Sequence, residues 1–165
     1  MRRSHLIITS ILTLGVGVAS ADGFPPCKPV NGRFEAVIVP PGQGHCPSAA
    51  GVLCTAGSAW GGIQGSYQFV QSGFHPSALI GGVPTVIFYT GQSTVSLRSG
   101  DQLNGTDTGA IDVPPEGQGG FASLITWAGG TGGMSSASGQ IRLTGRIDGN
   151  NGTTSGEYAG TVCRG

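Results

Sequence analysis

Charged residues and long apolar runs are both scarce in this chain. Asp, Glu, Lys and Arg make up 10% of the 165 residues, and the basic residues are scattered instead of forming a stripe. Nothing in the sequence therefore indicates nucleic acid as a partner. Beyond residue 21, no apolar stretch approaches the roughly 20 residues that a membrane-spanning helix needs. We therefore expect no stable membrane insertion.

Recognisable catalytic and metal-binding patterns are missing as well. The sequence contains no Ser-His-Asp order, P-loop, H-E-x-x-H motif or paired catalytic carboxylates. It has no C-x-x-C pair, and His45 and Cys46 taken with Cys54 and His75 do not reproduce a zinc-ligand spacing. We therefore expect neither a metal ion nor a cofactor.

Residues 1–21 have the features of a cleavable secretory signal peptide. Two arginines near the start form a basic region, residues 6–18 form an apolar region, and Ala19-Ser20-Ala21 is the small-x-small pattern that signal peptidases accept. Cleavage there leaves residues 22–165, which is enough for one domain with its own core. We expect a soluble, secreted product in an extracellular or periplasmic location.

All four cysteines lie in the mature part, and their even number in an oxidising compartment favours disulfides over zinc. Cys46 and Cys54 flank a short loop and are predicted to pair. Cys27 precedes the first predicted strand and Cys163 ends the last. In a closed antiparallel barrel with an even strand number, these two positions meet at one rim. Pairing of Cys54 with Cys163 is the main alternative.

The composition favours β-structure. Gly accounts for 32 of the 165 residues, and after residue 21 no 11-residue window shows a helical apolar stripe. Period-two alternation is clear at Ile141, Leu143 and Ile147. Eight strands separated by Gly, Pro, Asn or Asp are predicted at residues 32–39, 62–70, 84–91, 93–98, 102–112, 120–127, 139–148 and 153–163. The expected fold is an all-β, disulfide-stapled, eight-stranded antiparallel barrel, with a two-sheet β-sandwich as the alternative.

The last two thirds of the chain carry a series of short motifs, including GGIQGSYQF, VIFYTG, GDQLNGTDTGAID and GEYAGTVC. The most specific is a G-G-T-G-x-(aromatic or Met) turn at residues 129–134, followed by a Gly-led strand at 139–145. These motifs resemble the allene oxide cyclase and dirigent type of small β-barrel. The resemblance implies an eight-stranded antiparallel barrel, often oligomeric, whose apolar pocket takes a small hydrophobic molecule. It implies no particular reaction, and residues 22 to about 55 lie outside it.

Asp107 is the leading candidate for a functional acid. In the predicted strand 102–112 it shares a face with Leu103 and Ile111, because side chains alternate between the two faces of a strand. A carboxyl group on an apolar face has a raised pKa unless it is paired, which suits a proton donor or base in a pocket. The alternatives are that Gly105 and Gly109 mark a bulge that reverses the phase, or that Asp107 accepts backbone N–H groups.

The predicted pocket combines two tyrosines with apolar side chains on the inward phase. Tyr67 and Tyr158 are placed to donate a hydrogen bond to a ligand oxygen. The lining residues named with them are Phe69, Phe88, Ile111 and Ile141, together with Ile63.

Three functions are open at this stage. The first is binding of a small hydrophobic molecule inside the barrel. The second is a cofactor-independent cyclase or isomerase, or dirigent-like stereocontrol, with Asp107 moving a proton. The third is a structural or adhesive role for the outer strand faces. A cavity with a polar group at depth favours the first two, whereas an interior filled by large side chains favours the third.

Overall fold

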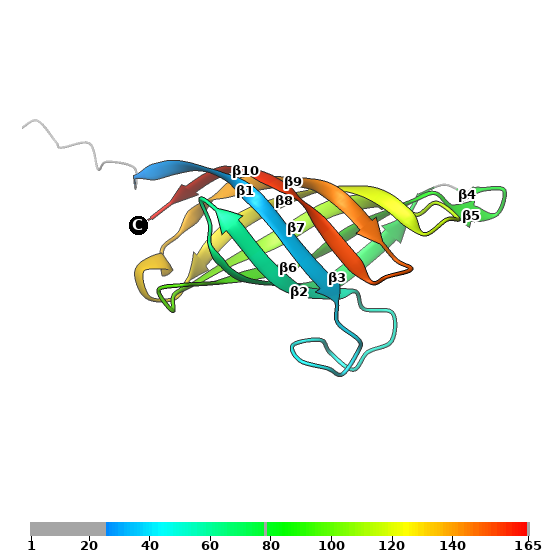
Figure 1. Ribbon diagram of the computed structural model, residues 1–165, viewed down its shortest axis with the longest axis horizontal. Coiled ribbons are helices and arrows are strands. Elements are labelled where there is room, and N and C mark those ends of the chain that lie inside the picture. Colours follow the sequence, from blue (N-terminus) through cyan, green and yellow to red (C-terminus); the bar gives the residue numbers. More distant parts are fainter. Residues whose placement is uncertain (1–25, 78, 165) are drawn as a thin grey trace, which may run out of the picture.

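The computed structural model describes residues 26–77 and 79–164, which fold almost entirely into β-strands. Eight antiparallel strands form one closed barrel, in the order β1, β10, β9, β8, β7, β6, β3, β2 around the wall (Figure 1). They are β1 (Cys27–Ile38), β2 (Cys54–Gly61), β3 (Gly65–Pro76), β6 (Val86–Leu97), β7 (Gln102–Asp112), β8 (Gln118–Gly130), β9 (Ser138–Asp148) and β10 (Thr153–Cys163). The predicted eight-stranded antiparallel barrel is confirmed.

Three short elements complete the described chain. Strands β4 (Leu79–Ile80) and β5 (Val83–Pro84) form a separate two-stranded sheet, and a 3-10 turn, η1, spans Gly132–Met134. No helix formed by the described residues is long and apolar enough to cross a membrane. The predicted signal peptide, residues 1–21, lies outside the described residues.

The strand prediction contains two errors. One strand was missed and another was counted as two, so the total of eight is nevertheless correct. Residues 54–61 form β2, which was not predicted because its inward side chains are small and give no apolar alternation. Residues 84–91 and 93–98 were predicted as two strands, but residues 86–97 form the single strand β6. Gly91 is a position inside this strand, and a Cβ there would lie 2.3 Å from the ring of Phe69.

The barrel closes through its first and last strands. β1 pairs with β10, and Cys27 lies opposite Cys163 at the end of this ladder. Disulfides join Cys27 to Cys163 and Cys46 to Cys54, so the favoured pairing is confirmed and the Cys54 to Cys163 alternative is wrong. We call the barrel end that holds Cys27 and Cys163 the terminal end. The two disulfides fit an oxidising, non-cytosolic compartment.

At the opposite end the β3–β6 hairpin continues past its neighbours as an arm, tipped by β4 and β5 (Figure 1). We call this end of the barrel the arm end. Large apolar side chains are exposed on the arm, namely Phe74, Leu79, Ile80, Val83 and Phe88.

Glycines on the inner face let large rings meet across the barrel. Gly145 on β9 and Gly156 on β10 lie directly opposite each other. The absence of side chains there leaves room for Phe34 and Phe121, whose ring centroids are 5.9 Å apart. A Cβ on Gly145 would come 2.8 Å from the Phe121 ring. The interior is therefore packed by a few large side chains on a wall rich in glycine.

Candidate functional site

Asp107 points into the barrel from the middle of β7 and is only 2% exposed. The inward phase predicted for Leu103, Asp107 and Ile111 holds along the strand. A register shift does occur between β7 and β8 near Leu103, but the extra residue belongs to β8, where Gly129 has a φ of 102°. The bulge alternative for Asp107 is therefore wrong, because the irregularity leaves the phase of β7 unchanged.

Two serine hydroxyls hold the Asp107 carboxyl group. Ser93 on β6 donates to Oδ2 at 2.9 Å, and Ser123 on β8 donates to Oδ1. The Tyr67 hydroxyl lies 3.3 Å from the Ser93 hydroxyl. Because the single Ser93 proton is given to Asp107, Tyr67 is the donor in that pair. Tyr89 lies on the other side, near Ser123. The result is a row of hydroxyl groups from β3, β6 and β8 centred on one carboxyl group.

The electrostatics of the group are set by burial. Loss of hydration raises the pKa of Asp107 above its ordinary value, and the hydrogen bonds from Ser123 and Ser93 offset only part of this shift. Burial, with the nearby Asp107 carboxyl as a second cause, also raises the pKa of Tyr67 and Tyr89. Both phenols therefore keep their protons. Within the described ranges, no cationic side chain pairs with Asp107, so protonation is the main way in which this group avoids an unpaired buried charge.

A partly enclosed cavity of about 40 Å³ adjoins Asp107 on the side of the arm end. Apart from Asp107 and five side chains that carry a hydroxyl group, the lining is apolar. The lining residues are Phe34, Leu53, Thr55, Tyr67, Phe69, Tyr89, Asp107, Ile111, Phe121, Ser123, Leu143, Ile147 and Thr154. A cavity needs about 10–15 Å³ of such volume to hold one water molecule. The cavity therefore accepts a few waters or the terminal group of a larger molecule.

The predicted pocket residues divide into three groups. Tyr67, Phe69 and Ile111 line the Asp107 cavity. Ile141 points inward but lines a second, smaller void of about 20 Å³ nearer the terminal end. Phe88 is 51% exposed on the outer face, so the expectation that it lines the interior is wrong. Its neighbour Tyr89 takes the inward position, because the phase of β6 runs unbroken through Gly91.

Tyr158 is inward and only 4% exposed, but it does not reach the Asp107 cavity. Its hydroxyl accepts from the backbone N–H of Ile63 at 2.8 Å. It also lies within donating distance of the carbonyl oxygens of Trp60 at 3.0 Å and Ile63 at 2.9 Å. Tyr158 thus ties β10 to the turn between β2 and β3, and its hydrogen-bonding capacity is used by the backbone.

Large side chains occupy most of the terminal half of the interior. Ile63, Leu103, Ile125 and Trp127 are each at most 4% exposed there. Met134, on the turn η1, is equally buried. These side chains leave a void of about 20 Å³ in the interior. A further cavity of about 90 Å³ opens at the terminal rim, where it is lined by Lys28, Val30, Gly62, Ile63, Leu97, Leu103, Met134, Val162 and Arg164. Neither cavity is lined by Asp107.

Sequence reasoning did not find Ser93 and Ser123. Ser123 lies on the inward phase between Phe121 and Ile125, so the alternation of β8 carried a usable signal. Ser93 was hidden because the division of β6 after residue 91 removed the continuous phase that runs from Tyr89 to Val95. Counting inward polar residues on a correctly bounded strand would have identified both.

The raised pKa of Asp107 gives a pH-dependent stability. The pKa of Asp107 is higher in the folded protein than in the unfolded chain. At pH values between these two pKa values, the folded protein therefore binds more protons than the unfolded chain. We expect the free energy of unfolding to fall as the pH rises from about 4 through the folded-state pKa and then to level off. Asp107→Asn should abolish this contribution, which thermal unfolding at a series of pH values measures as the difference between variant and wild type.

The control for this measurement is Asp101→Asn, in the turn between β6 and β7. This variant keeps Asp107 and should therefore keep the pH-dependent contribution of Asp107. A wild-type profile that is also parallel to that of Asp107→Asn would contradict the assignment of a raised pKa to Asp107.

Comparison of the chain with protein-family models, with curated proteins and with solved structures finds no match. The resemblance to allene oxide cyclase and dirigent barrels therefore stays a prediction. Within residues 26–77 and 79–164, no three His, Cys, Asp or Glu side chains lie close enough together to hold a metal ion.

Proposed function

We propose that the protein is a secreted barrel that binds a small, uncharged, largely apolar molecule at the arm end, with an oxygen of that molecule beside Asp107. The observation that carries this proposal is the buried Asp107 carboxyl group, which adjoins a cavity with a mainly apolar lining. A barrel that served only as a scaffold would gain stability from an apolar residue there, since burying a carboxyl group without a cation is unfavourable.

The chemistry of the site defines the ligand. With its pKa raised by burial, the Asp107 carboxyl is suited to donate a hydrogen bond to a hydroxyl, carbonyl or ether oxygen. The cavity of about 40 Å³ admits only the oxygen-bearing end. The remainder of the molecule would contact Leu53, Ile111 and Phe121 nearer the rim.

Export is part of the proposal. The pattern of residues 1–21 indicates a signal peptide, and both disulfides fit an oxidising destination. The ligand is then a molecule that reaches the protein outside the cytoplasm.

The test is to purify the mature protein from its host and identify co-purifying small molecules by mass spectrometry. We expect an oxygen-containing apolar compound, retained about tenfold or more better by the wild type than by Asp107→Leu, because leucine has a similar size but cannot form the hydrogen bond. Asp101→Asn is the control and should retain it fully. Equal retention by all three proteins, or no bound compound in any, would contradict the proposal.

A second candidate is a cofactor-independent cyclase or isomerase acting at the same site. It is favoured by the hydroxyl chain from Tyr67 through Ser93 to Asp107, which provides a proton donor and acceptor in a site that excludes most water. The identified compound distinguishes the two candidates. A compound that the wild type converts and Asp107→Asn binds unchanged indicates catalysis, whereas one that the wild type releases unaltered indicates binding alone.

A further inference from the structure

A second hollow lies on the outside of the barrel, over β2, β1, β10 and β9. Its volume is about 690 Å³, within the range of ligand sites. It is lined by Asn31, Gly32, Arg33, Trp60, Gly61, Arg142, Thr144, Glu157, Tyr158 and Ala159. None of these residues lines the Asp107 cavity, so the hollow is a separate site on the other side of the wall.

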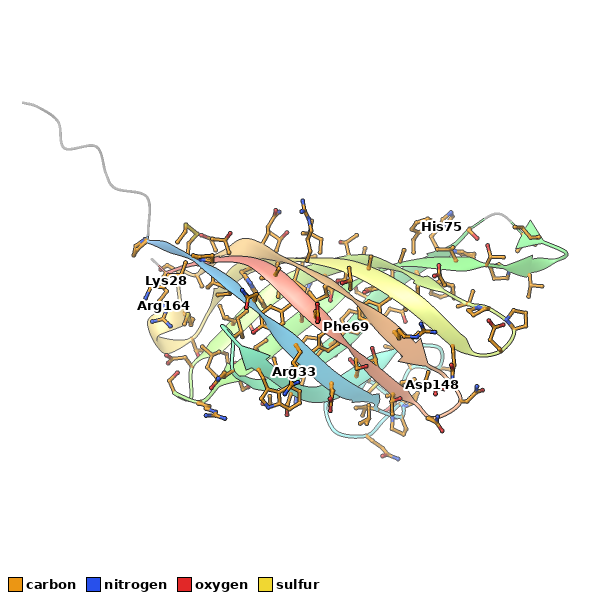
Figure 2. The ribbon with its side chains drawn as sticks, turned by 45° about the horizontal axis from the view of Figure 1, so that its top comes forward. Lys28, Arg33, Phe69, His75, Asp148 and Arg164 are labelled. Atoms are coloured by element: carbon orange, nitrogen blue, oxygen red, sulfur yellow. A yellow bond between two sulfur atoms is a disulfide. The ribbon has the colours of Figure 1, made fainter. Side chains whose placement is uncertain are left out.

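Strand register places the key side chains of the hollow next to one another. Arg33 lies opposite Trp60 on one side and opposite Glu157 on the other. In the adjacent row, Arg142 lies opposite Ala159. Figure 2 shows Arg33 on β1 at about the middle of the barrel, away from Lys28 and Asp148 near the two ends. The small residues Gly61 and Ala159 form the base of the hollow. The longer side chains of Arg33, Trp60, Arg142 and Glu157 surround it.

The charged side chains of this hollow form no ion pair or hydrogen bond with residues 26–77 and 79–164. The guanidinium carbon of Arg33 lies 6.0 Å from the centre of the Trp60 ring, a cation–π contact. Within the same ranges, the side chains of Arg142 and Glu157 make no hydrogen bond or ion pair. Two guanidinium groups, one carboxylate and an aromatic ring are therefore available together.

Charge is concentrated on this side of the barrel. The sequence contains no Asp, Glu, Lys or Arg between Glu35 and Arg98, and none between Glu116 and Arg142. Strands β2, β3, β6 and β8 consequently carry no charged side chain. The hollow thus has an excess of positive charge on a wall that is otherwise mostly uncharged.

We propose that this hollow binds an acidic saccharide, a short chain of uronic acid units. The Trp60 ring, over which the Arg33 guanidinium lies, offers its remaining apolar surface to the C–H side of a sugar ring. Arg33 and Arg142 offer planar donor pairs that match a carboxylate, and Glu157, Asn31 and Thr144 offer hydrogen bonds to hydroxyl groups. A neutral sugar would leave both guanidinium groups unpaired. A nucleic acid would need a basic track beyond the hollow, and the uncharged strands do not provide one.

The test uses tetragalacturonate as the probe and isothermal titration calorimetry as the measurement. We expect wild-type binding that weakens as NaCl is raised, because exposed charges are screened. Arg142→Ala and Trp60→Ala should each raise Kd about tenfold or more. Arg142→Lys should give an intermediate Kd, since it keeps the charge but loses the planar pair of donors.

Arg146→Ala is the matched control, because Arg146 is exposed on the same strand, carries the same charge and lies outside the hollow. Its Kd should stay within about twofold of the wild-type value. No binding of tetragalacturonate at millimolar concentration, equal loss in Arg146→Ala, or equally tight binding of neutral cellotetraose would each overturn the proposal. Circular dichroism spectra confirm that each variant is folded. The result does not bear on the Asp107 cavity, whose variants are tested separately.

Discussion

Replacement of Cys27 and Cys163 by serine is expected to lower the free energy of unfolding by about 5 kcal/mol, the largest loss for any change considered for this protein. The disulfide closes a sequence separation of 136 residues, so its loss frees almost the whole chain in the unfolded state. It also removes the covalent end of the β1–β10 ladder. The melting temperature should fall by about 10 to 20 °C, which a differential scanning calorimeter measures directly.

The second disulfide provides the matched control. Cys46 and Cys54 are only 8 residues apart in sequence, and loop-closure entropy alone assigns their bridge about 2.5 kcal/mol. The pair Cys46→Ser and Cys54→Ser should therefore be clearly more stable than the pair Cys27→Ser and Cys163→Ser. Equal destabilisation of the two double variants would contradict the loop-entropy explanation.

Gly32→Ala is expected to lower the free energy of unfolding by at least about 3 kcal/mol. A Cβ at this position would lie 1.9 Å from the carbonyl oxygen of Trp60 and 2.5 Å from the Tyr158 hydroxyl. Relief of these clashes requires β1 to move away from β2, or Tyr158 to abandon its bonds to Ile63. Either movement exposes interior apolar surface or leaves buried backbone groups unpaired.

Chemical denaturation followed by tryptophan fluorescence measures this loss. Gly120→Ala is the control, because Gly120 is also a strand glycine and its nearest neighbour would be the exposed Asp112 carboxylate at 3.2 Å, which can move. We expect a change below about 1 kcal/mol there. A Gly32→Ala variant as stable as Gly120→Ala would show that the tie made by Tyr158 contributes little.

Period-two patterns predicted the barrel because they report directly on which face of a strand is buried. The alternation in β7 and β9 was strong enough to place Asp107 and Ile141 inward. The pairing of the cysteines followed from topology, since Cys27 and Cys163 lie on the two strands that close the barrel. These inferences needed only the local sequence and the rule of even strand number.

The remaining errors arose where a strand lacks large side chains or where glycine was interpreted as a turn. β2 has Thr55, Gly57 and Ala59 in positions that other strands fill with larger residues, so the sequence gives no apolar period there. Gly91 was taken as a strand boundary, although it provides room for the Phe69 ring. A glycine that receives a neighbouring ring and a glycine that ends a strand are identical in sequence and differ only in tertiary context.

The role of Tyr158 shows a different limit. The sequence correctly places it on the inward phase, but phase does not reveal what the hydroxyl contacts. Its partners are Trp60 and Ile63, more than 90 residues away, with separations of 98 and 95. Such a contact depends on β1 carrying a glycine between β10 and β2, which no local pattern indicates. Similarly, the hydroxyls of Ser93 and Ser123 become partners of Asp107 only when β6, β7 and β8 pair in the folded barrel.

The pairing of β1 with β10 also determines the order in which this barrel can form. Hairpins such as β9–β10 join neighbours in sequence, but the ladder that closes the wall joins residues separated by up to 136 positions. Chains dominated by such distant pairings fold slowly, on a scale of about milliseconds to seconds. Closure must wait until the last strand has been synthesised and delivered. Until then the apolar inner face is exposed to water and to other chains. The rate at which the eleven residues of β10 pair with β1 therefore determines how long the protein is prone to aggregate.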